Sequence, residues 1–154
     1  MDKKRGFTLV EMLVVLAIIG MLLGISIPFT SGFGKGLRIK TASRAILGTL
    51  RVARSSAITY RDRQMVVFDA QEGAYWIQDE DGNISEKKHK LPGSIKFELP
   101  GNKESDPITF KDDAVIFVPS GAVEGPSGTI TLSDKGGDSR TISIISSTGK
   151  ITIQ

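Results

Sequence analysis

Glu11 has the most unusual chemical surroundings of any residue in this sequence. It is the only ionisable residue in the apolar run from Phe7 to Ile27. A charged group inside a membrane helix costs about 2.5–3.5 kcal/mol on insertion scales, so a carboxylate there must be paired, protonated or near the interface. Because the run contains no basic residue, a partner has to be an N-terminal amine or a group on another copy. Alternatively, Glu11 reaches the lipid head groups and needs no partner.

The remaining titratable residues give little support to catalysis. The chain has no cysteine and one histidine, His89, which excludes a disulfide framework, a thiolate nucleophile and a cysteine or multi-histidine metal site. No nucleophile lies beside His89, and no nucleophile-elbow motif is present. Asp112 and Asp113 are adjacent, so their side chains are expected to point apart. We therefore predict that the protein is not an enzyme and has no catalytic residues, no metal and no cofactor.

The densest acidic cluster, from Asp79 to Asn83, could offer oxygen ligands to calcium. It lacks the alternating ligand positions and the terminal glutamate of an EF-hand loop, and no flanking helices are evident. The sequence favours a simple turn here and leaves calcium binding undecided.

Basic residues gather in a segment that has no acidic residue between Pro28 and Arg61. A basic run is usually a solvated helix face. It can also be a surface for an acidic partner, for lipid head groups or for nucleic acid. The candidate residues for contact with a partner or with DNA are Arg38, Arg44, Arg51 and Arg54.

The apolar run that contains Glu11 is predicted to be a membrane helix. A helix over 7–27 is about 31 Å long, which matches the hydrocarbon core of a bilayer. The basic residues in positions 3–5 favour a cytoplasmic N-terminus and an exported C-terminal domain. A secretory signal peptide fits less well, because its apolar run is about 7–15 residues long and ends in a small-residue cleavage site. A buried core helix would be unusually apolar for so small a domain.

The rest of the chain predicts an α+β domain. Pro28 and the glycines after it indicate a kink or a melted stretch over 28–36. An amphipathic helix is expected over 37–60, where apolar residues recur at three- and four-residue steps. Short β-branched and aromatic runs over 64–154 indicate a mostly antiparallel sheet on which this helix packs. The expected strands are 64–68, 74–78, 95–99, 108–110, 114–118, 128–132, 140–145 and 150–153.

The N-terminal residues resemble a known processing signal. The stretch Lys-Arg-Gly-Phe-Thr-Leu-Val-Glu-Met-Leu over 4–13 is similar to the type III signal sequence of type IV pilins and of the pseudopilins of type II secretion systems. The resemblance implies that a prepilin peptidase removes the leader 1–6 by cutting between Gly6 and Phe7, and that it methylates Phe7. It also implies that Glu11 faces the N-terminal amine of a neighbouring subunit during filament assembly.

The later motifs resemble the GspH/FimT branch of this family. The similarity lies in the helical segment Arg51–Ile58 and in four strand-and-turn patterns, which are Phe117–Gly121, Gly128–Leu132, Arg140–Ile144 and Ser147–Ile151. With the N-terminal signal, the resemblance spans nearly the whole chain, and 69–113 is its least characteristic part. It implies a pilin-like fold, in which a long N-terminal helix with a transmembrane half and an amphipathic half packs on the sheet.

The resemblance predicts a minor pseudopilin of the bacterial inner membrane that joins the periplasmic pseudopilus of type II protein secretion. Its implied partners are other pilin or pseudopilin subunits, prepilin peptidase, the inner-membrane assembly platform and membrane lipid. The alternative is a FimT-like minor pilin that binds DNA for uptake in transformation. FimT-like DNA binders tend to carry arginines in the C-terminal tail, whereas this chain has Lys150 and no arginine after Gly149, which counts against nucleic acid as the partner.

Overall fold

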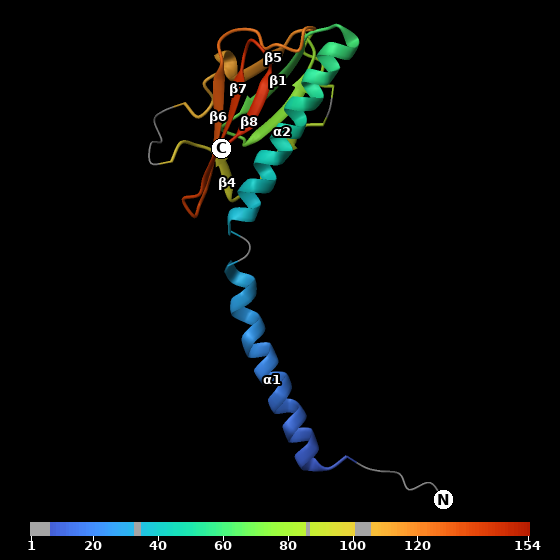
Figure 1. The fold of residues 1–154 in the computed structure, drawn as a ribbon, viewed down its shortest axis with the longest axis vertical. Helices are drawn as coiled ribbons and strands as arrows, with labels where there is room; N and C mark the ends of the chain where they lie inside the picture. Colours follow the sequence, from blue (N-terminus) through green and yellow to red (C-terminus); the bar gives the residue numbers. More distant parts are fainter. Residues whose placement is uncertain (1–6, 33–34, 86, 101–105) are drawn as a thin grey trace, which may run out of the picture. The chain divides into compact units, whose positions relative to one another are not determined.

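The computed structural model describes residues 7–32, 35–85, 87–100 and 106–154. The chain divides into two compact units, Met1–Lys35 and Gly36–Gln154 (Figure 1). The leader expected at 1–6, including the glycine of the expected cleavage site, lies outside the described residues. All the strands belong to the second unit.

The first unit contains one helix, α1 (Leu9–Gly32), in which Glu11 is the only ionisable residue. The side chains from Phe7 to Leu23 are all exposed. A helix that is apolar on every side needs an apolar medium or other helices around it. Among the described residues, no helix combines the length and the apolar character that a membrane crossing requires.

Residues 28–32, where the sequence predicts a kink or a melted stretch, are helical in the structure. Pro28 removes one backbone donor from the helix, but the turns on either side keep their own hydrogen bonds, so a helix can continue past a proline. Residues 33–34 of the expected break lie outside the described residues, and the next helix begins at Lys35.

That next helix, α2 (Lys35–Tyr60), corresponds to the amphipathic helix predicted over 37–60. Its buried apolar residues recur at three- and four-residue spacing and are Ile39, Ala42, Ile46, Leu50, Ala53 and Ala57. The alanines let the sheets approach the helix closely. Each fully buried aliphatic side chain contributes about 1.5–3 kcal/mol relative to an exposed one.

The strands form two four-stranded antiparallel sheets. The first has the order β3-β2-β1-β5 and the second has the order β4-β6-β7-β8. The first sheet comprises β1 (Gln64–Asp69), β2 (Ala74–Gln78), β3 (His89–Lys90) and β5 (Ala114–Phe117). The second comprises β4 (Ile95–Phe97), β6 (Gly128–Asp134), β7 (Ser139–Ile145) and β8 (Lys150–Ile153). A short 3-10 helix, Lys111–Asp113, precedes β5. The α+β class and the antiparallel pairing are confirmed, whereas the sequence predicted a single sheet.

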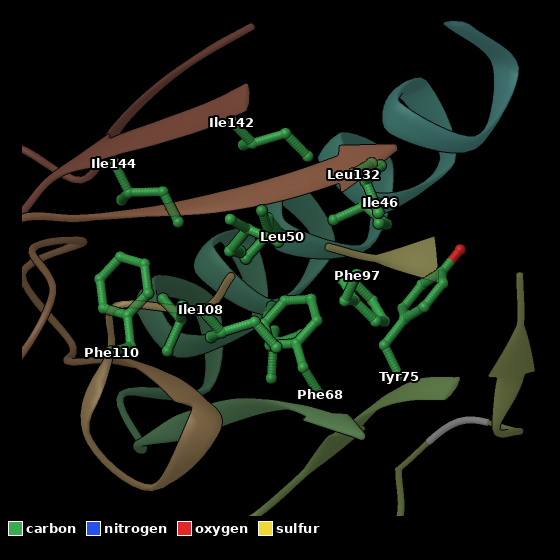
Figure 2. Close-up of a cluster of buried hydrophobic side chains, with 14 of the residues drawn as sticks. Ile46, Leu50, Phe68, Tyr75, Phe97, Ile108, Phe110, Leu132, Ile142 and Ile144 are labelled. Atoms are coloured by element: carbon green, nitrogen blue, oxygen red, sulfur yellow. The ribbon is translucent and has the colours of Figure 1, made fainter. Parts of the chain in front are cut away.

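The core lies where α2 meets both sheets (Figure 2). Phe68 of β1 packs edge-on against Phe97 of β4, with 5.8 Å between ring centroids, and this contact joins the two sheets. From α2, Ile46 and Leu50 reach toward Leu132 of β6 in the same cluster. One continuous core therefore supports the whole second unit.

Two predictions about strands differ from the structure. The strand expected at 108–110 is reduced to an isolated bridge between Ile108 and Ile130, and Asp106 accepts the backbone N–H of Ile108 at 2.9 Å. The exposed strand β3 was not predicted, because two exposed polar residues carry no apolar alternation. Its position depends on pairing with β2, and the ring of His89 stacks on Tyr75 with 5.4 Å between centroids.

Candidate assembly and partner-binding surfaces

α1 begins with a capping box that uses Glu11. The backbone N–H of Thr8 donates to Oε2 of Glu11 at 3.4 Å, and the backbone N–H of Glu11 donates to Oγ1 of Thr8 at 3.3 Å. This reciprocal pair satisfies two backbone donors at the start of the helix. The carboxylate also lies in the first turn, where the helix dipole favours negative charge. The Thr-x-x-Glu spacing over 8–11 is the sequence signal for this local role.

The four arginines predicted as partner or DNA contacts lie in two different environments. Arg38, Arg44 and Arg51 are exposed on α2. Among the described residues, ion pairs involve only Arg63, which binds Glu80 and Glu124. The three exposed arginines are therefore available to an anionic partner.

Arg54 is half-buried and holds α2 to two loops. Its Nε donates to the carbonyl oxygen of Gly121 at 2.9 Å, and its Nη2 donates to the carbonyl oxygen of Thr148 at 3.1 Å. We call Arg54, Gly121 and Thr148 the arginine anchor. A hydrogen bond with a charged donor contributes about 1.5–3 kcal/mol. The anchor therefore gives Arg54 a structural role inside the chain.

Two glycines allow the loops of the anchor to close on each other. Gly121 has φ +80° and Gly149 has φ +60°, a region that L side chains rarely adopt. A Cβ at Gly149 would meet the carbonyl oxygen of Gly121, and a Cβ at Gly121 would lie 2.8 Å from Cδ1 of Ile58. Only glycine fits at either position without displacing its neighbours.

The arginine anchor explains three motifs that stand far apart in the sequence. It joins Arg51–Ile58 of α2 to the loop that ends Phe117–Gly121 and to the loop that opens Ser147–Ile151. Nothing in the spacing of these motifs predicts that they meet. The sequence signals only the separate parts, which are the helical arginine and the two glycine turns at 119–121 and 147–149.

The acidic cluster at 79–83 forms a self-contained turn. Asp79 accepts the backbone N–H of Asn83 at 2.8 Å with one carboxylate oxygen and the side-chain amide of Asn83 at 3.0 Å with the other. The hydrogen bonds from Asn83, first from its side chain and then from its backbone, lower the pKa of Asp79. In the described part of the chain, no group of three or more acidic or histidine side chains could hold a metal ion.

The adjacent carboxylates Asp112 and Asp113 share a strained turn. Both have left-handed backbones, with φ of +56° and +50°. Partial burial raises the pKa of Asp113, and the charges of Asp106, Asp112 and Asp69 raise it further. Burial is therefore the larger cause of the raised pKa, and repulsion between the carboxylates adds to it.

Two protein-family models match the sequence. The prokaryotic N-terminal methylation motif matches residues 1–27, and the Type II transport protein GspH matches residues 42–149. The second match covers more than half of the chain. It extends from Ala42 of α2 to Gly149 and therefore includes the arginine anchor.

The chain is also similar to individual relatives. Type II secretion system protein H of Xanthomonas campestris pv. campestris is 26% identical over 132 residues, which cover 84% of this chain and 73% of that protein. The type IV minor pilin FimU of Pseudomonas aeruginosa has a TM-score of 0.58 at 18% identity, covering 79% of this chain and 92% of FimU. The minor pseudopilin EpsH from the type 2 secretion system of Vibrio cholerae has a TM-score of 0.56 at 14% identity, covering 76% and 96%. These structures confirm the pilin-like fold, and the chain, which carries the N-terminal methylation motif, belongs to the family of the Type II transport protein GspH.

Proposed function

We propose that this protein is a minor pseudopilin, a structural subunit of the periplasmic pseudopilus used in type II protein secretion. The observation that carries the proposal is the match to the methylation motif and to GspH in one chain. The relative named as protein H of a type II secretion system supports it. The two units suit the role, because an exposed apolar helix can pack into a filament while a compact second unit is displayed.

Processing and anchoring prepare the helix for assembly. In our proposal, prepilin peptidase cuts between Gly6 and Phe7 and methylates the new amine of Phe7. The segment 7–27 then anchors the protein in the inner membrane, with its N-terminus cytoplasmic and the second unit in the periplasm. The methylation motif over 1–27 and the exposed apolar side chains of α1 support this arrangement. The partners are other pilin or pseudopilin subunits, the peptidase, the assembly platform and membrane lipid.

Glu11 sets the axial register of assembly by meeting the Phe7 amine of a neighbouring subunit. The capping box holds the carboxylate at the start of α1, where such an amine can reach it. Its contact with the Thr8 N–H is 3.4 Å long, longer than a strong hydrogen bond, and a carboxylate can accept several donors. The contact with Thr8 therefore leaves Glu11 free to accept the neighbour's amine.

Substitution of Glu11 tests this role. Glu11→Gln keeps a residue that can complete the capping box but removes the charge, whereas Glu11→Ala removes both. Both variants should insert in the membrane normally and appear several-fold less in sheared pseudopilus fractions on immunoblots. Met12→Leu, which changes the next residue without changing charge, is the control.

Two outcomes would contradict the charge pair. Normal incorporation of Glu11→Gln with a defect only in Glu11→Ala would assign the effect to the helix cap. Normal incorporation of both variants would remove Glu11 from assembly altogether.

A second function, DNA capture by a FimT-like minor pilin, is favoured by the three exposed arginines on α2. A titration of the whole protein in nonionic detergent with duplex DNA, at low and physiological salt, separates the two. Binding to phosphates falls steeply with salt, so tight, salt-sensitive binding that Arg44→Ala/Arg51→Ala abolishes would favour DNA uptake. If the protein binds no DNA even at low salt, the type II secretion pseudopilin remains the proposed function.

A further inference from the structure

A basic groove lies between the C-terminal half of α2 and the start of β8, which run side by side in Figure 1. Its volume is about 270 Å³. The side chains and backbone that line it are those of Arg51, Arg54, Thr148, Gly149, Lys150 and Ile151. All the ionisable groups of this lining are cations.

The positive charge of the basic groove has no counterion within the described residues. Arg54 donates to two carbonyl oxygens, which carry no net charge, and its Nη1 makes no hydrogen bond in the part of the chain that the structure describes. Arg51 and Lys150 are exposed, and the ion pairs in the described part of the chain involve Arg63 instead. One cation is thus held rigidly at the wall of the groove while two others can adjust around a ligand. A carboxylate suits this set, because guanidinium groups bind carboxylates in a bidentate geometry.

The basic groove also borders an unpaired strand edge. β8 is the last strand of its sheet and pairs only with β7 among the described strands. Gln154 and Thr141 exchange both backbone hydrogen bonds, and bonded pairs alternate along an antiparallel ladder. Thr152 and Lys150 therefore also bond to β7, whereas Ile151 and Ile153 direct their N–H and C=O groups to the free side. Such an edge can accept an extended peptide as an additional strand.

We propose that the basic groove binds an extended, acidic segment of another exported protein. The backbone of the segment pairs with the free edge of β8 at Ile151, and its carboxylates on the α2 side of the sheet face Arg51 and Arg54. Lys150, which alternates with the core-packed Ile151, adds positive charge from the other side of the strand. Because alternate residues of a strand share one face, the segment should carry acidic residues at every second position. This binding site goes beyond the pseudopilin function, and its test does not depend on filament assembly.

The test uses fluorescence anisotropy with the whole protein in nonionic detergent. The probe is a labelled peptide in which aspartate alternates with threonine or valine, and the matched peptide has asparagine for every aspartate. The aspartate peptide should bind at least tenfold more tightly than the asparagine peptide. Arg51→Ala/Lys150→Ala should lower its affinity at least tenfold, and Lys40→Ala/Lys111→Ala, which removes two exposed cations outside the groove, should not. Arg54 is left intact because it anchors α2.

A third peptide tests the strand pairing. Methylation of alternate backbone amides of the aspartate peptide should also lower its affinity at least tenfold, and unchanged affinity would overturn pairing with β8. Equal binding of the aspartate and asparagine peptides, or unchanged binding by Arg51→Ala/Lys150→Ala, would overturn the acidic site. Tighter binding of a 20-base-pair DNA duplex than of the peptide would overturn it in favour of nucleic acid.

Discussion

Arg54 shows how one side chain can stabilise a junction between a helix and two loops. Arg54→Ala removes both hydrogen bonds of the arginine anchor and should lower the free energy of unfolding by about 2 kcal/mol, since bonds to charged donors contribute about 1.5–3 kcal/mol. Chemical denaturation followed by the fluorescence of Trp76, the only tryptophan, measures it. Arg51→Ala is the control: Arg51 is exposed one turn earlier on α2 and should change stability by less than about 0.5 kcal/mol. Equal losses in the two variants would contradict the anchor.

Asp113 should make the stability of the folded protein depend on pH. Partial burial and then the charges of Asp106, Asp112 and Asp69 raise its pKa in the folded protein. The folded state therefore binds the proton of Asp113 more tightly than the unfolded state does. Protonated Asp113 favours the folded state at low pH, and this stabilisation is lost as pH rises through the folded pKa. Asp113→Asn removes the charge and suits the left-handed backbone. The variant should unfold at a higher urea concentration than the parent at pH 7, and the gain should shrink towards zero at pH 3.

Asp81→Asn provides the comparison for this prediction, because Asp81 is exposed in a different acidic turn. An equal gain in stability for Asp81→Asn would show that overall net charge, rather than the surroundings of Asp113, causes the effect. A gain for Asp113→Asn that persists at pH 3 would show that the backbone preference of asparagine is the cause.

Among the secondary-structure elements, α2 contributes the side chains that fill the space between the two sheets. Leu50 is fully buried, whereas Val52 on the other side of the helix is 45% exposed. Leu50→Ala removes buried methyl groups and leaves a cavity, which should cost about 2–5 kcal/mol of stability. Val52→Ala should cost less than about 1 kcal/mol. Urea denaturation monitored by Trp76 fluorescence tests both, and similar costs would mean that Leu50 does not pack as the structure places it.

The elements whose evidence is local were predictable from the sequence. Apolar residues at helical spacing identified α2, and β-branched runs identified β1, β2 and β8 almost to the residue. The division into two sheets was not predictable, because a strand does not encode its partner in its own pattern; packing such as that of Phe68 on Phe97 decides it. For the same reason β3, which depends on β2 alone, was missed.

The candidate surfaces likewise include one feature that the sequence predicts and one that it does not. The Thr8 to Glu11 spacing is a local signal, so its capping role could be read from four residues. The inward orientation of Arg54 depends on two loops that lie 67 and 94 residues further along the chain. A basic run on a helix therefore indicates charge, but only the packed structure tells which arginine is exposed.

At the scale of the whole molecule, the second unit has a buried core of its own. The described residues of that core run from Ile39 to Ile153 within the second unit. The fragment Gly36–Gln154 should therefore unfold within about 3 °C of the whole protein, a difference of less than about 1 kcal/mol for a domain of this size. Differential scanning fluorimetry of the fragment, and of the whole protein in nonionic detergent, measures this.

The association state of the two forms completes the same prediction. The fragment should elute as a monomer from a size-exclusion column, whereas the whole protein without detergent should associate, because the apolar side chains from Leu9 to Leu23 are exposed. An unfolded fragment would show that the core depends on α1, and a monomeric whole protein would show that α1 does not drive association. Independent folding would also separate the two proposals experimentally: substitutions at Glu11 would report on assembly, and substitutions at Arg51 and Lys150 would report on the basic groove.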